Sequence, residues 1–153
     1  NKKSDNLITK NKKAYFDYEI KDTYEAGIML IGHEVKSIRA GHVNLKWSYI
    51  VFNWDEAYIK WMHVTPWKAL PNNKSIEPSP ERKVFLHKKN IIQLKTKSRE
   101  WGYSVIPLML YYKWSLIKIS IWLAKWRKVF EKKQVLKERT MQKEAKKALS
   151  KFI

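Results

Sequence analysis

The sequence contains no cysteine among its 153 residues. This absence excludes disulfide frameworks, thiolate metal sites and cysteine nucleophiles together. Acidic residues are scarce as well, because 14 Asp and Glu stand against 32 Lys and Arg, which gives a formal net charge of +18. A folded domain tolerates such a charge most readily beside a polyanion, so nucleic acid or an anionic membrane surface is the first expectation for a partner.

Long hydrophobic runs are also missing. The longest nearly unbroken apolar stretch, Tyr103 to Tyr112, has about half of the ~20 residues that a membrane-spanning helix needs. Pro107 interrupts it. The N-terminal residues lack the charged-then-apolar layout of a secretory signal. We therefore expect a cytoplasmic protein that does not enter a membrane.

Catalytic motifs are absent from the sequence too. It has no Walker loop, no dinucleotide-binding fingerprint and no nucleophile elbow. The four histidines show no metal-ligand spacing. A nuclease that pairs Glu34 with a histidine is the formal alternative. We expect instead a protein that is not an enzyme and that uses neither a metal nor a cofactor.

The hydrophobic content of 44% fits one compact domain with additional segments at its ends. Residues 1–14 are polar and basic and predict a flexible arm. Residues 15–125 predict the folded domain, and residues 126–153 a basic tail. Alternating apolar and polar residues predict strands or hairpins at 15–31, 48–52, 56–64, 102–113 and 115–126.

A helix is expected from Glu81 to Lys97, because the apolar residues there fall close to one face. Residues 66–80 hold four of the five prolines and predict a loop. Several antiparallel strands with few short helices indicate a mainly β, α+β protein built on a small barrel.

The segment "GHEVKSIRAGHVNL", residues 32–45, predicts a short helix in which Glu34 lies in the first turn and Gly41 marks the end. Two roles for Glu34 are compatible with this placement. The carboxylate can simply complement the positive end of the helix dipole. Alternatively, it can accept hydrogen bonds from an RNA base edge or ribose hydroxyl while Lys36 and Arg39 hold the flanking phosphates.

The longer stretch "EAGIMLIGHEVKSIRAGHVNL", residues 25–45, resembles the small protein B family, the tmRNA-binding proteins of bacterial ribosome rescue. A G-x-E-V-K-S-[LI]-R-x-G segment is the most telling signature of that family. The similarity continues in order through "NKKAYFDYEI", "SYIVF", "EAYIKWMHVTPW", "EPSPERKVFLHKKNI", "GYSVIPLMLYYK" and "LIKISIWLAK". The resemblance implies an OB-like antiparallel β-barrel with flanking short helices.

The same resemblance implies the partners. The family binds the tRNA-like domain of tmRNA around its D-loop and elbow, and its tail enters the decoding centre and empty mRNA channel of the small ribosomal subunit. Elongation factor Tu is then an indirect partner, through aminoacylated tmRNA, and we expect a monomer. A generic OB-type, ribosome-associated RNA-binding protein without selectivity for tmRNA is the alternative, because basic charge predicts affinity for any RNA.

Site residues follow from the matched motifs. Asn11 precedes the basic pair of an N-K/R-K/R-A motif, Glu34 belongs to E-V-K-S, and Leu86 belongs to a basic-apolar motif in which it either faces RNA or packs a helix. The expected tmRNA contacts are Asn11, Lys12, Lys13, Glu34, Lys36, Arg39 and Leu86.

The tail departs from the family pattern. A motif resembling G-K-K-x-x-D-K-R opens the tail in the family, whereas this chain has Trp126 for the glycine and Lys133 for the arginine. Expected ribosome contacts are Arg127, Lys128, Glu131, Lys132 and Lys133. Residues 125–151 carry 11 Lys and Arg against 3 Glu, and this repulsion predicts disorder in the free protein and a helix once rRNA phosphates neutralise the charge.

Eight tryptophans are many for a chain of this size. Trp54 and Trp114 lie in tight connections where Asn-Gly-like residues are expected. The tryptophans can serve as stacking platforms for unpaired bases. The favoured interpretation is that Trp61 and Trp122 pack on the barrel and that those in turns are replacements without an RNA role.

Overall fold

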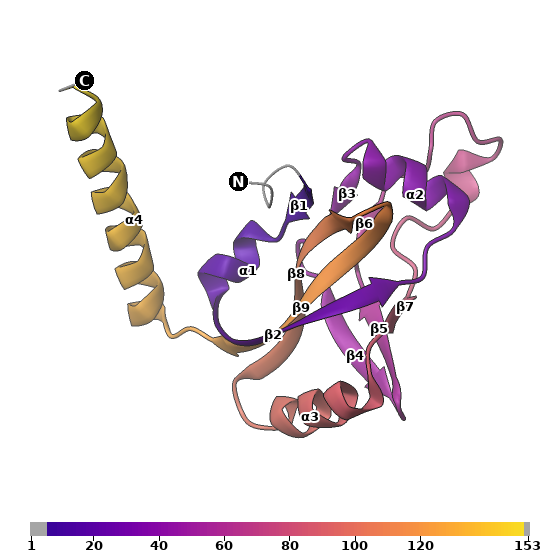
Figure 1. The fold of residues 1–153 in the computed structure, drawn as a ribbon, viewed down its shortest axis with the longest axis horizontal. Helices are drawn as coiled ribbons and strands as arrows, with labels where there is room; N and C mark the ends of the chain where they lie inside the picture. The colour runs from indigo at the N-terminus through magenta and orange to yellow at the C-terminus, as the bar shows by residue number, and fades with distance from the viewer. Residues whose placement is uncertain (1–5, 152–153) are drawn as a thin grey trace.

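The computed structural model describes residues 6–151. Its main feature is a seven-stranded antiparallel sheet in the order β1-β8-β9-β2-β7-β5-β4, and a two-stranded ribbon pairs β3 with β6 (Figure 1). The strands are β1 (Leu7–Lys10), β2 (Tyr18–Ile28), β3 (Val43–Asn44), β4 (Tyr49–Asn53), β5 (Glu56–Lys60), β6 (His63–Val64), β7 (Arg82–Phe85), β8 (Tyr103–Lys113) and β9 (Leu116–Trp126). The helices are α1 (Lys12–Asp17), α2 (Gly32–Arg39), the 3-10 turn η1 (Asn73–Ser75), α3 (Lys88–Ser98) and α4 (Val129–Ser150).

The two longest strands are buried on both faces. Along β9, Ile121 and Leu123 belong to the main core, whereas Trp122 and Ala124 belong to a second cluster beneath α1. This alternation is the period of two that a strand imposes on its side chains. Strand β2 pairs with β9 along most of its length and with β7 at its end. Because β4 also packs against β8, the sheet curls back on itself.

The predicted helix at 81–97 is wrong in its first half. Residues 82–85 form strand β7, which pairs with β2 and β5, and α3 begins only at Lys88. Within β7, Arg82 and Val84 are buried while Phe85 is exposed, which is strand periodicity. Burial of a charged residue at position 82 depends on a partner distant in sequence, so local apolar spacing could not reveal it.

The flexible arm also begins earlier than predicted in the sequence and gives way to structure before residue 14. Residues 7–10 form β1, an edge strand paired with β8, and Lys12 already begins α1. Strand β2 therefore starts at Tyr18 rather than at Tyr15. Residues 1–5 of the predicted arm and 152–153 of the predicted tail lie outside the described residues.

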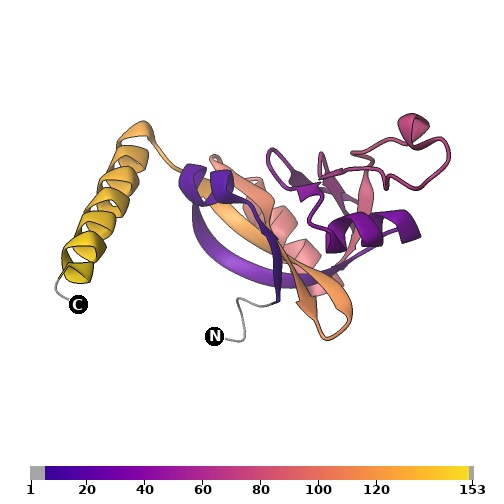
Figure 2. The ribbon, with the colours of Figure 1, turned by 90° about the horizontal axis from the view of Figure 1, so that it is seen from above.

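Helix α4 corrects the expected disorder of the tail, because residues 129–150 are helical in the chain alone. Helix-forming residues fill this segment, and the Glu131 carboxylate accepts a hydrogen bond from the Lys128 amide at 3.4 Å, which caps the first turn. None of its residues is buried, and the helix projects away from the sheet (Figure 2). Among the described residues, no helix combines the length and apolar character needed to cross a membrane.

This helix generates the first prediction. Circular dichroism of the protein without RNA should show more helical signal per molecule than a chain ending at Lys128, because α4 supplies 22 helical residues. The thermal midpoint of the shortened chain should stay close to that of the full chain, since α4 buries no side chain. Equal helical signals from the two chains would contradict a preformed α4.

Candidate nucleic-acid interface

Glu34 occupies the first turn of α2, as predicted, and its carboxylate is only 5% exposed. One carboxylate oxygen accepts a hydrogen bond from the Ile31 amide at 3.1 Å. The other accepts from the guanidinium of Arg82, which is itself 4% exposed. Arg82 also donates to the carbonyl oxygens of Met62 at 2.6 Å and Pro78 at 3.2 Å. The Glu34–Arg82 pair thus joins α2, β7 and the segments around residues 62 and 78.

This geometry bears on the two roles considered for Glu34. Both carboxylate oxygens already have donors inside the protein. A direct contact between Glu34 and RNA stays a prediction, and it would require the buried pair with Arg82 to open. The role that the geometry supports is to hold α2 in place, so that the exposed Lys36 and Arg39 project from a fixed helix.

Asn11 has a similar structural role at the start of α1. Its side-chain oxygen accepts a hydrogen bond from the Ala14 amide at 3.2 Å and so caps the helix. Its amide group donates to the carbonyl oxygens of Pro107 at 3.0 Å and Leu45 at 3.3 Å. Asn11 is 5% exposed, and it fixes the position from which the basic residues that follow it project.

A cluster of lysines surrounds a small cavity next to this cap. The cavity measures about 190 Å³ and is lined by Lys10, Asn11, Lys12, Lys13, Asn44 and Lys46. Four ammonium groups around one small hollow form a site suited to an anion of phosphate size. Helices α1 and α2 lie on the side of the sheet away from α3 (Figure 1), so the lysine cluster and the cations of α2 share that side.

Leu86 lies in the connection between β7 and α3, not in a helix as predicted, and it packs against the main core. Its packing role is therefore supported by the structure. The neighbouring Phe85 is 49% exposed and is the apolar side chain that the motif presents to solvent. The family motif drew attention to the leucine positions and missed this residue.

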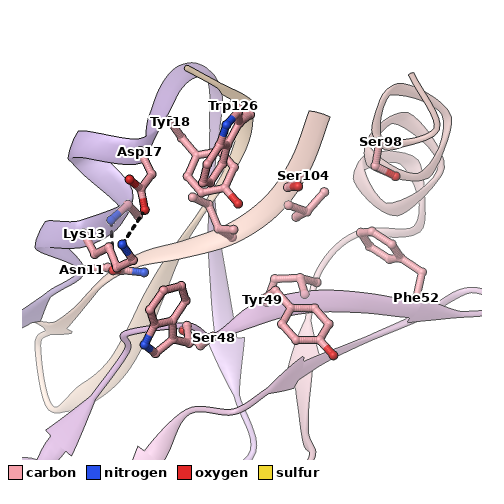
Figure 3. A pocket seen from close by; sticks show the side chains of 15 residues that line it. Asn11, Lys13, Asp17, Tyr18, Ser48, Tyr49, Phe52, Ser98, Ser104 and Trp126 are labelled. Atoms are coloured by element: carbon pink, nitrogen blue, oxygen red, sulfur yellow. Dashed lines mark hydrogen bonds and ion pairs between the residues drawn. The ribbon is translucent and has the colours of Figure 1, made fainter. Parts of the chain in front are cut away.

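Asp17 is the second residue that sequence reasoning missed. Its side chain is 5% exposed, and it accepts ion pairs from Lys13 at 3.1 Å and Lys132 at 3.3 Å. Its backbone carbonyl accepts a hydrogen bond from the Arg127 amide at 2.8 Å. Figure 3 shows Lys13 directed toward Asp17. The i, i+4 spacing of these two residues in "KKAYFD" was a usable signal for a helical ion pair.

Asp17 therefore connects α1 to the beginning of α4. Lys132 lies over the Trp126 ring at 3.7 Å from its centroid, which adds a cation–π contact at the same place. Of the other predicted ribosome contacts, Glu131 caps α4, Lys128 and Lys133 are exposed, and Arg127 is half-buried. The first turn of α4 is held on the body of the protein, whereas the remainder of the helix is free of buried contacts.

A larger cavity of about 340 Å³ opens between α1, β4 and β8. Asp17 and the aromatic rings of Tyr18, Tyr49 and Trp126 are among the side chains around it (Figure 3). Burial raises the pKa of the Tyr18 phenol above its ordinary value, so this hydroxyl stays protonated at neutral pH. Within residues 6–151, no cluster of three or more His, Asp or Glu side chains is placed to hold a metal ion.

Comparison with known proteins gives this geometry a family. A family model described as "SmpB protein" matches residues 8–151. The chain belongs to the SmpB family. The SsrA-binding protein of Pelobacter propionicus is 41% identical over 143 residues, which cover 94% of this chain and 93% of that protein. The SsrA-binding protein of Staphylococcus saprophyticus is 43% identical over 143 residues, covering 94% of this chain and 92% of that protein.

Structural comparison agrees with this membership in the SmpB family. A solved structure described as "tmRNA-SmpB: a journey to the center of the bacterial ribosome" matches with a TM-score of 0.67 and 35% identity, covering 80% of this chain and 86% of that chain. The sequence resemblance and the predicted mainly β, OB-like fold are both confirmed.

The Glu34–Arg82 pair generates the second prediction. Glu34→Ala should lower the free energy of unfolding by about 3–5 kcal/mol, because it leaves the Arg82 guanidinium buried without its charge partner. Denaturant unfolding measures this change. Lys88→Ala, which removes the exposed pair with Asp55, is the control and should change stability little. A Glu34→Ala protein as stable as the parent would contradict the structural role of the pair.

Proposed function

We propose that this chain is a tmRNA-binding factor of trans-translation, the rescue of stalled ribosomes. It holds the tRNA-like domain of tmRNA around the D-loop and elbow, and it places its basic tail in the decoding centre and empty mRNA channel. The observation that carries the proposal is membership in the SmpB family along nearly the whole chain, residues 8–151. The proposed role needs no bond to be made or broken.

The relatives support the choice of RNA. The similar proteins of P. propionicus and S. saprophyticus are named for binding SsrA, and the matched solved structure is described as a tmRNA–SmpB complex with the bacterial ribosome. In keeping with those partners, we propose that the protein acts as a cytoplasmic, ribosome-associated monomer. Contact with elongation factor Tu would then be indirect, through aminoacylated tmRNA.

The exposed cations support a phosphate-binding surface. Lys12, Lys36 and Arg39 are exposed, and the lysine cluster around the 190 Å³ cavity concentrates further positive charge next to α1. Charge of this kind attracts any RNA. Selectivity for one folded RNA then depends on the fixed spacing of these cations, which Asn11 and the Glu34–Arg82 pair maintain through their buried hydrogen bonds.

A competition experiment tests this proposal and gives the third prediction. At physiological salt, the tRNA-like domain of tmRNA should bind at least about tenfold more tightly than an ordinary tRNA, a difference of ~1.4 kcal/mol. Lys12→Ala and Lys36→Ala should each weaken binding and reduce the slope of log K against log salt by roughly 0.7–0.9 per lost phosphate contact. Lys21→Ala is the matched control, because Glu19 already neutralises Lys21 at 3.0 Å.

Equal affinity for the two RNAs would favour the alternative, a generic OB-fold RNA-binding protein associated with the ribosome. An unchanged salt slope in both lysine variants would move the phosphate contacts away from α1 and α2.

The connection between Asp17 and the tail gives the fourth prediction. Asp17→Asn removes the ion pairs with Lys13 and Lys132, so the direction of α4 is no longer fixed. Binding to free tmRNA should be largely retained, whereas tagging of stalled nascent chains in a reconstituted trans-translation assay should fall. Glu19→Gln, a carboxylate with an exposed ion pair, is the control. Full tagging activity in Asp17→Asn would show that the anchor is dispensable.

A further inference from the structure

Four tryptophans have a backbone conformation that favours glycine. Their φ angles are positive, at 69° for Trp47, 59° for Trp54, 68° for Trp61 and 57° for Trp114. Within residues 6–151, the other residues with positive φ are Asn72, Gly41 and Gly102. In this left-handed region the Cβ of an L-residue crowds the neighbouring carbonyl oxygen, which glycine avoids and asparagine tolerates better than bulky residues do.

The fold requires this conformation at two of the four positions. Asn53 pairs with Glu56, so Trp54 and Asp55 form a two-residue turn between β4 and β5. Lys113 pairs with Leu116, so Trp114 and Ser115 form a two-residue turn between β8 and β9. Two-residue hairpin turns match the twist of their strands only with positive φ, which is why Gly, Asn and Asp predominate there. Tryptophan is the wrong residue type for both turns.

The tryptophan side chains obtain little in return for this strain. Their exposed fractions are 61% for Trp47, 85% for Trp54, 62% for Trp61 and 87% for Trp114. The expectation that Trp61 packs on the barrel is therefore wrong, whereas Trp122, at 7%, does pack in the second cluster. The hydrogen bond from Lys95 at Trp54 uses the backbone carbonyl, which glycine would supply equally well.

The remaining contacts of these side chains are with other surface groups. Trp47 has the Lys13 ammonium at 4.5 Å from its ring, and Trp61 has a tilted contact with Tyr49 at 6.4 Å. The β4–β5 turn and the β8–β9 turn also lie at different ends of the sheet (Figure 1). The four rings therefore do not form one platform on which consecutive bases of an RNA strand could stack.

We propose that Trp47, Trp54, Trp61 and Trp114 occupy glycine positions of this fold, and that the chain produced in its own organism has glycine at these four residues. The codon UGA accounts for all four at once, because some genetic codes read it as tryptophan and others as glycine. Composition agrees, since the chain has 4 glycines in 153 residues, well below the average glycine content of about 7%.

The gene and the natural protein test the proposal directly. The codons for the four residues should all be UGA, and peptide mass spectrometry of the protein purified from its source cells should show glycine masses at all four positions. UGG codons, or peptides with tryptophan masses at these positions, would overturn it.

Protein stability provides an independent test, and it is the fifth prediction. The chain with tryptophan at all four positions is compared with a variant carrying W47G, W54G, W61G and W114G. The thermal midpoint of the variant should rise by roughly 2–4 °C for each relieved position. Trp101→Gly is the matched control, because Trp101 is 92% exposed but does not have positive φ, and it should give no rise.

Binding of the tmRNA tRNA-like domain distinguishes backbone relief from loss of a stacking surface. The fourfold variant should retain its affinity, whereas the loss of stacked rings would weaken binding by roughly fivefold or more per base. A fourfold variant with an unchanged or lower thermal midpoint, or with weakened RNA binding, would contradict the assignment of glycine to these positions.

Discussion

The buried ion pair between Glu34 and Arg82 is the constraint on which the arrangement of the sheet and α2 depends. Two opposite charges inside a protein are tolerated only when they are paired and hydrogen-bonded. Here the backbone supplies the remaining partners, because Ile31 donates to Glu34 while Met62 and Pro78 accept from Arg82. Four segments that are distant in sequence are thereby fixed relative to one another.

Asn11 and Glu34 show how a conserved-looking polar motif can act on RNA indirectly. Both side chains are buried, and both use their polar atoms within the protein. Each precedes exposed cations by one or two positions, namely Lys12 after Asn11 and Lys36 after Glu34. A rigid separation between cationic groups gives shape selectivity that charge alone cannot provide, because phosphate attraction does not depend on sequence.

Sequence patterns predicted the parts of the fold that depend on local periodicity. Strands β8 and β9 have 11 residues each with a tight connection, and α2 has its acid in the first turn and a glycine after its end. The failures involve tertiary partners. Arg82 entered a strand because Glu34 neutralises it, and residues 7–10 became ordered because β8 offers an edge.

The site was predictable to a similar extent. The motifs located the exposed cations of α1 and α2, but they assigned direct contacts to two side chains that lie inside the protein. Asp17 was missed because its importance comes from Lys132, which is distant in sequence. The tail was expected to be disordered because of its charge, whereas its helix-forming residues and the Glu131 cap produced a helix.

The dimensions of α4 have a further consequence. At about 1.5 Å per residue, its 22 residues extend roughly 33 Å from an attachment made only at the first turn. A small angular change at Asp17 would sweep the far end of the helix through a wide arc. The protein thus works as a lever whose fulcrum lies beside the RNA-facing helices, and its free end can respond to what α1 holds.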